Sequence, residues 1–199
     1  MDQVHWIEEI HMKAVLLALL ALPWQVAARA GAPPDPAPMP GSLQSAIRPR
    51  PADLLGETTA KAILANRAKF RDNLAKVQLD DDLRSRWKAV RQPVTLVAVF
   101  GSWCGDSHRQ LPDLLALEAE PNPFIEIHYL GVARNKAVTA WPRGCPPQKV
   151  DRVPTFYLFA TQPGGRQKLT GTVVETPPRA GQTMAMALVE LLEASGRAL

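Results

Sequence analysis

The spacing of apolar residues along the chain changes near position 93, from a helical repeat to short and nearly continuous runs. The run VTLVAVF at 94–100 is almost unbroken and rich in β-branched residues, which is typical of a central strand buried on both faces. Three similar runs predict further strands at 124–130, 155–160 and 168–174. The sequence Pro163-Gly164-Gly165 predicts a turn between the last two of these strands.

Helical spacing is found before, between and after these strands. Between Glu57 and Val77, apolar residues recur on one face and predict one amphipathic helix: Ile63, Phe70, Leu74 and Val77. Further helices are predicted at 81–90, 105–118 and 181–194, and the stretch from 131 through Trp141 is expected to be helical or irregular. The resulting order, β-α-β-α-β-β-α, predicts an α/β sandwich with a mixed central sheet, preceded by an α-helical extension.

The first thirty residues predict an export signal. A short apolar run, AVLLALLAL at 14–22, is followed by the small-residue cleavage site Ala28-Arg29-Ala30. This run is much shorter than the about 20 apolar residues that a membrane-spanning helix needs. Acidic residues precede Lys13, whereas an export signal begins with positive charge, so we expect translation to start at Met12. The mature chain is then exported, to the periplasm or another extracytoplasmic space, unless the signal is retained as a membrane anchor.

Prolines recur throughout the segment 31–52. Such a segment forms neither a helix nor a central strand, and it is expected to be a disordered or polyproline-like tether. The predicted organisation is a signal peptide at 1–30, this tether, a helical extension at 53–92 and a folded domain at 93–199.

Composition and charge narrow the function. The 199 residues carry a net charge of +4, and no basic stripe is interleaved with aromatic residues, so nucleic-acid binding is not predicted. The chain has only two cysteines, Cys104 and Cys145, and no Cys-x-x-Cys pair, which excludes a disulfide scaffold and a zinc site built on paired thiolates. The four histidines do not fall at ligand spacing within one helix. Neither a metal nor an organic cofactor is predicted.

Cys104 is the candidate reactive residue because it follows a predicted buried strand and opens a predicted helix. The N–H groups and partial positive charge of a helix N-terminus stabilise a thiolate, which is the nucleophile of disulfide exchange. Gly105 permits a tight turn, and Ser107 can place its hydroxyl near the sulfur. Asp106 acts in the opposite direction, because a nearby carboxylate disfavours a thiolate. His108 is expected to be a solvated helix residue.

The unit formed by a strand, Trp103-Cys104-x-x-Ser107 and a helix resembles the active site of the thioredoxin superfamily, and Val153-Pro154-Thr155 resembles its cis-proline loop. The stretches FGSWCGDSHRQLP, VDRVPTFYLF and GTVVETP resemble a bacterial exported subgroup with a WCGDS motif. This resemblance covers about residues 57–195 and implies a thioredoxin-like three-layer sandwich.

The resemblance also implies roles for individual residues. Pro154 would pack beside Cys104 in a cis peptide bond, and Val153 would pair with the backbone of a substrate. The rim of the active site and the substrate groove would comprise Trp103, Gly105, Asp106, Val153, Pro154 and Thr155.

Ser107 replaces the second cysteine of the thioredoxin motif, so a two-thiol cycle cannot run within the motif. Three alternatives are open: a substrate thiol or small thiol resolves a mixed disulfide on Cys104, Cys145 acts as a distant resolving thiol, or Cys104 does no redox work. Cys145 lies nine residues before Pro154, and a bridge to Cys104 needs the two Cα atoms within about 7 Å. The other interpretation of Cys145 is a buried thiol that packs as a small hydrophobe.

Two functions follow as hypotheses. The first is a monothiol thioredoxin-like oxidoreductase that exchanges thiols and disulfides with client proteins through Cys104, with a small thiol or a separate reductase as a further partner. The second is a non-catalytic binding module that docks partners along the cis-proline groove at Val153. A thiol peroxidase is disfavoured, because residues 100–103 lack the proline and threonine that peroxiredoxins place ahead of their cysteine.

Overall fold

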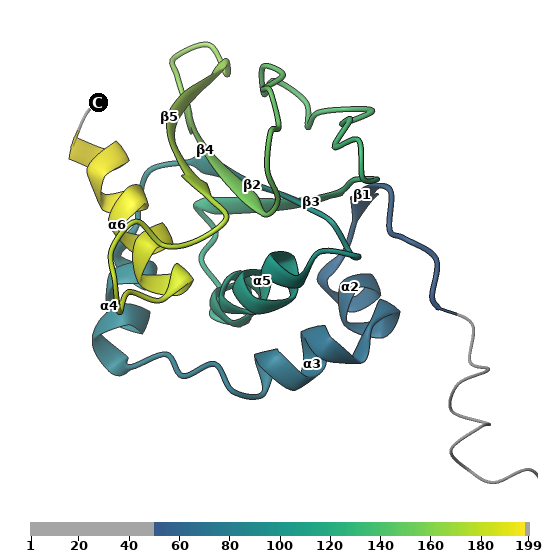
Figure 1. The fold of residues 1–199 in the computed structure, drawn as a ribbon. Helices are drawn as coiled ribbons and strands as arrows, with labels where there is room; N and C mark the ends of the chain where they lie inside the picture. Colours follow the sequence, from purple (N-terminus) through teal and green to yellow (C-terminus); the bar gives the residue numbers. More distant parts are fainter. Residues whose placement is uncertain (1–49, 198–199) are drawn as a thin grey trace, which may run out of the picture. The chain divides into compact units, whose positions relative to one another are not determined.

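The computed structural model describes residues 50–197 (Figure 1). The predicted signal peptide at 1–30 and residues 31–49 of the predicted tether lie outside the described residues. None of the helices between residues 50 and 197 combines the length and the hydrophobicity of a membrane-spanning segment.

The described chain forms five strands and five helices. In chain order they are β1 (Gly56–Thr58), α2 (Ala60–Asn66), α3 (Ala68–Leu74), α4 (Asp81–Ala89), β2 (Val94–Phe100), α5 (Gly105–Glu118), β3 (Ile125–Gly131), β4 (Thr155–Thr161), β5 (Gln167–Val174) and α6 (Met184–Arg197). The strands make one sheet in the order β1-β3-β2-β4-β5. Only the β2–β3 pair is parallel, so the predicted mixed sheet of an α/β sandwich is confirmed.

β2 is the centre of the sheet, and all seven of its residues are buried. Helix α5 makes the crossover that a parallel pair of strands requires between β2 and β3. On the other side, β2 pairs antiparallel with β4, and Val99 near the end of β2 lies opposite Thr155 at the start of β4. The loop that follows β2 and the loop that precedes β4 therefore meet at one edge of the sheet. This edge is the row of strand ends where β2 ends, not an outer strand.

The two faces of the sheet are covered differently. On one face, a helix-side cluster joins the sheet to α3, α4, α5 and α6; it includes Phe70, Trp87, Leu96, Phe100, Leu111, Leu114, Val173 and Leu188. On the other face, a loop-side cluster comprises Val97, Val99, Leu130, Val132, Cys145, Val153, Tyr157 and Phe159. The irregular chain between β3 and β4 covers this second face, as Figure 1 shows, and its Val138, Trp141 and Val150 pack against the cluster.

Most of the elements predicted from apolar spacing are confirmed. Helix α5 has the predicted bounds, and β2 does as well. The stretch after β3 is irregular rather than helical. Helix α6 begins at Met184, three residues later than predicted, because Gly181 adopts a φ of 74° and the Thr183 side chain accepts a hydrogen bond from Met186 N–H at 3.1 Å.

The single helix predicted between Glu57 and Val77 is wrong. The segment holds strand β1 and two shorter helices, which meet at Arg67. The backbone of Arg67 is extended, with φ −136° and ψ 134°, so the helical repeat is interrupted there although the apolar spacing continues across it. Strand β1 has only three residues, which is too short for an alternating pattern to reveal.

The approach of β1 to the sheet requires a glycine at position 131. Gly131 is opposite Gly56 in the β1–β3 pair, and a Cβ atom at position 131 would lie 2.4 Å from the carbonyl oxygen of Leu54. A backbone oxygen cannot rotate away as a side chain can. The segment before β1 is therefore held in contact with the end of β3.

We expect Gly131→Ala to lower the free energy of unfolding by about 1–3 kcal/mol, because the added methyl group forces the two backbones apart. Urea denaturation measures the change. Gly196→Ala is the matched control, because a Cβ there has its nearest neighbour at 3.6 Å and alanine favours a helix. Equal stability of the two variants would contradict the close approach at Gly131.

Candidate functional site

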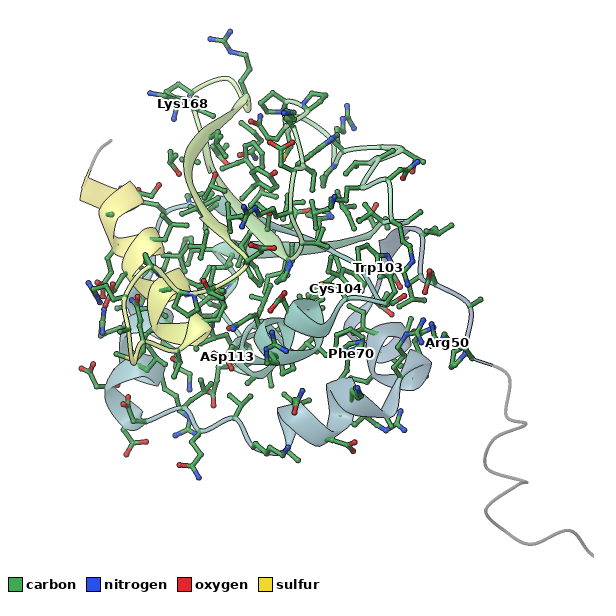
Figure 2. The ribbon with its side chains drawn as sticks, in the orientation of Figure 1. Arg50, Phe70, Trp103, Cys104, Asp113 and Lys168 are labelled. Atoms are coloured by element: carbon green, nitrogen blue, oxygen red, sulfur yellow. The ribbon has the colours of Figure 1, made fainter. Side chains whose placement is uncertain are left out.

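Cys104 lies at the sheet edge where the two loops meet. It is the N-cap residue of α5, its side chain is half-buried, and its N–H donates to the carbonyl of Gly101 at 2.9 Å. Figure 2 places Cys104 at the start of α5 with Trp103 beside it. The thiol donates a hydrogen bond to the carbonyl oxygen of Val153 at 3.2 Å. This contact brings the sulfur directly to the loop before β4.

The loop before β4 contains a cis peptide bond between Val153 and Pro154. The carbonyl of Pro154 accepts a hydrogen bond from Glu175 N–H at 2.7 Å, just past the end of β5. The Thr155 hydroxyl donates to the Arg152 carbonyl at 2.7 Å, and the Arg152 guanidinium pairs with the Glu175 carboxylate at 2.7 Å. Hydrogen bonds and an ion pair on both sides of Pro154 therefore hold the Val153 carbonyl in place opposite Cys104.

Ser102 holds the loop that leads from β2 to Cys104. Its side chain is fully buried, and its hydroxyl accepts a hydrogen bond from Leu54 N–H at 3.0 Å and donates to the Asp53 carboxylate at 3.3 Å. Arg67 in turn pairs with Asp53 at 2.7 Å and donates to the Pro51 carbonyl at 3.2 Å. These contacts form a clamp that holds the segment before β1 against residues 101–104. This loop between β2 and α5 carries the candidate reactive cysteine and is called the reactive loop.

His108 supports the same loop from α5, and the expectation that it is solvated is wrong. Only 8% of the residue is exposed, and its ring packs edge-on against Phe70 with 4.8 Å between centroids. Its Nε2 lies 2.8 Å from the Ser102 carbonyl, and because a carbonyl only accepts, this nitrogen carries the hydrogen. Burial lowers the pKa of His108, and nearby positive charges add to this effect, among them Lys69 and Arg67.

The residues between Cys104 and His108 have separate contacts. Ser107 is fully buried and its hydroxyl accepts a hydrogen bond from Gly101 N–H at 3.2 Å. Within the described residues, no hydrogen bond joins Ser107 to Cys104, so its proposed role near the sulfur stays a prediction. Asp106 pairs with Arg109 one turn along the helix, and Gly105 is exposed.

Trp103 lies beside Cys104, on the side of the site toward β3. Its indole N–H donates to the carbonyl of Val132 at 2.9 Å, and its ring packs against the loop-side cluster. The guanidinium of Arg134 lies 4.9 Å from the ring centroid, in cation–π contact. The indole therefore has one edge fixed and one face covered by a positive charge.

Cys145 contributes to the loop-side cluster, against which Cys104 also packs. Both cysteines are free in the structure. Cys145 is only 6% exposed, and burial, together with the negative charge of Glu126, raises the pKa of its thiol to about 11. Cys145 therefore has the surroundings of a packed, protonated thiol.

Sequence patterns did not reveal the clamp on the reactive loop. Asp53 and Ser102 are 49 residues apart. The hydrogen bond that His108 donates to the Ser102 carbonyl depends on how α5 packs. The only local sign is that a serine and a histidine flank the Cys104 motif. Across residues 50–197, no group of three or more His, Cys, Asp or Glu side chains is arranged to hold a metal ion.

A thioredoxin family model matches residues 55–185, which is more than half of the chain. The chain therefore belongs to this thioredoxin family, and the thioredoxin-like fold expected from its motifs is confirmed. No curated protein matches it.

Two solved structures resemble the chain at low identity. A crystal structure of a protein of unknown function from Pseudomonas aeruginosa is 18% identical, with a TM-score of 0.48, over 72% of this chain and 94% of the other. An HIV epitope scaffold is 19% identical, with a TM-score of 0.42, over 71% of this chain and 89% of the other. At these levels neither structure supports a statement about activity.

We expect Ser102→Ala to lower the free energy of unfolding by about 1–3 kcal/mol, because it removes one hydrogen bond to Asp53 and another from Leu54 N–H beside a buried site. Chemical denaturation measures the loss. Ser85→Ala, at an exposed position in α4, is the control and should change stability by less than about 0.5 kcal/mol. If Ser102→Ala is as stable as the control, the clamp contributes nothing.

The buried His108 should make stability depend on pH. In the unfolded chain, His108 takes up a proton below its ordinary pKa of about 6.5, whereas burial lowers its pKa in the folded protein. The free energy of unfolding therefore falls as the pH drops through about 6.5. His108→Gln keeps a donor for the Ser102 carbonyl but cannot be protonated. We expect the stability of the native protein to decline relative to His108→Gln between about pH 8 and about pH 5. Parallel curves for the two proteins would contradict this assignment.

Proposed function

We propose that this protein exchanges thiols and disulfides with client proteins through Cys104. The observation that supports the proposal best is the position of Cys104, half-buried at the N-terminus of α5 and next to the loop that holds the cis peptide bond before Pro154. A helix N-terminus stabilises the attacking thiolate. The chain bends at 152–154 beside the sulfur, and the resemblance to thioredoxins assigns the pairing with a client backbone to Val153.

In the proposed reaction, Cys104 gives its proton to solvent and its thiolate attacks one sulfur of a client disulfide. A new S–S bond forms on Cys104, the client bond breaks, and the second client sulfur leaves as a thiolate that takes up a proton. A thiol from the client or from a small molecule then attacks the mixed disulfide and releases Cys104 as a thiolate. Each step exchanges one disulfide for another, so no further electron acceptor is needed.

The resolving thiol in this proposal comes from outside the chain. Ser107 has no thiol, and its hydroxyl is bonded to the backbone of Gly101. The pKa of about 11 at Cys145 leaves about one molecule in ten thousand as thiolate at neutral pH, which makes this buried group a poor nucleophile. These two observations favour the monothiol cycle over internal resolution.

A specific contact favours the alternative, a binding module without catalysis. Only the protonated thiol of Cys104 can donate to the carbonyl of Val153, and ionisation removes that hydrogen bond. In a binding module, partners would dock along the groove at Val153 and the thiol would remain a structural donor. The reactivity of Cys104 in the folded protein distinguishes the two functions.

We also infer that the mature protein acts outside the cytoplasm, in the periplasm or an equivalent space. The apolar run and cleavage site within residues 1–30 support this inference. Proteins with disulfides are abundant in such compartments, so clients for an exchange reaction would be present.

The test is the reaction of the folded protein with a chromogenic aromatic disulfide, which releases a coloured thiolate on exchange. We expect the native protein and Cys145→Ser to release the colour rapidly, and Cys104→Ser to lose the fast reaction entirely. Cys145→Ser is the matched control, because it removes the other thiol by the same substitution. After denaturation, Cys104→Ser should regain a reaction through the exposed Cys145.

Two results would contradict the exchange function. One is a Cys104 that reacts no faster in the folded protein than in the denatured chain, which would favour the binding module. The other is a fast reaction that persists in Cys104→Ser, which would assign the reactive thiol to Cys145.

A further inference from the structure

Leu55 and Val174 are large apolar side chains that remain exposed, to 63% and 46% respectively. No other large apolar side chain in the described part of the chain is exposed to this degree. Single apolar residues are common on protein surfaces, so exposure alone is not informative. The position of Leu55 and Val174 relative to Cys104 is informative.

Both residues lie along the row of strand ends at which β2 ends and the reactive loop begins. Leu55 immediately precedes β1, which begins opposite Gly131, the last residue of β3. Val174 is the last residue of β5 and lies opposite Thr155, the first residue of β4. Because β2 ends at the same edge, the loop to Cys104 emerges between them.

Both residues also point away from the helix-side cluster. Leu54 packs against that cluster, whereas the next residue, Leu55, is exposed and makes no part of it. Val174 follows Val173, which packs in the helix-side cluster, so Val174 points to the loop side. The thiol of Cys104 packs against the loop-side cluster as well.

The strand order makes the arrangement symmetric. β2 is in the middle of the sheet, with β1 two strands away on one side and β5 two strands away on the other, and Figure 1 shows β1 and β5 at opposite ends of the row. Two strand spacings are about 10 Å, which an extended chain covers in about three residues. A segment lying across this edge with its cysteine at Cys104 would thus bring its third residue on either side near Leu55 or Val174.

We propose that Leu55 and Val174 select the clients of Cys104 by contacting apolar side chains about three residues before and after the target cysteine. The occupant is an extended polypeptide segment, because the reactive sulfur lies between the two contacts and must meet a cysteine there. This inference rests on the proposed exchange function and adds the class of substrate to it.

The experiment uses two peptides that differ only at the third positions on either side of a central cysteine, with leucine in one and serine in the other. The cysteine is joined by a disulfide to a small chromogenic thiol, which is released when Cys104 attacks and the peptide is transferred to it. The rate constant for the leucine peptide divided by that for the serine peptide is the specificity ratio. We expect a ratio of about five to ten for the native protein, since each contact removes apolar surface from water.

In the double variant Leu55→Ser/Val174→Ser, we expect the specificity ratio to fall to about one. Thr172→Ser is the control. Thr172 is an exposed residue of β5 that lies two positions before Val174, further from Cys104, so this variant should keep the native specificity ratio. A native ratio near one, or a double variant that keeps the native ratio, would show that these residues do not select clients.

Two further outcomes are distinguished from these. If the native protein reacts with neither peptide, the exchange function fails, and anisotropy of labelled peptides with serine in place of the central cysteine then tests docking alone. A preference for leucine that depends on Leu55 and Val174 would keep the inference for a binding module, and its absence would overturn it. If sedimentation shows a native dimer that the double variant abolishes while the specificity ratio persists, the surface serves a second copy and the proposal is wrong.

Discussion

The hydrogen bonds of Ser102 fix the position of the reactive loop, and the geometry of the site depends on them. The hydroxyl joins the loop to Asp53 and Leu54 at the start of the described chain, and the carbonyl joins it to His108 in α5. Two residues later in the chain, the sulfur of Cys104 meets the carbonyl of Val153. With its preceding loop held from both sides, the N-terminus of α5 has a defined place beside the carbonyl of Val153.

The same clamp is part of how residues 51–74 fold. Arg67 pairs with Asp53 and donates to the Pro51 carbonyl, and the extended backbone at Arg67 separates α2 from α3. The close approach of Leu54 to Gly131 then allows β1 to add to the edge of the sheet. The break in the expected helix and the clamp on the reactive loop are therefore parts of one arrangement.

Apolar spacing predicted much of this fold because burial determines it. Strand β2 is buried on both faces and α5 has one buried face, and both were predicted with the observed bounds. The break at Arg67, strand β1 and the burial of His108 were missed, because each depends on contacts between residues far apart in the sequence. The motif residues around Cys104 and Pro154 could be predicted because they are local, whereas the partners that hold them could not.

The absence of a second motif thiol leaves one question at the centre of the account, namely whether Cys104 reacts alone. The most direct measurement is to treat the folded protein with oxidised glutathione, block the remaining thiols, and map the disulfides by mass spectrometry without reduction. We expect glutathione on Cys104 and a blocked, unoxidised Cys145. A bridge between Cys104 and Cys145 would show internal resolution, and an unmodified Cys104 would show that the site does no exchange; either result would contradict the account.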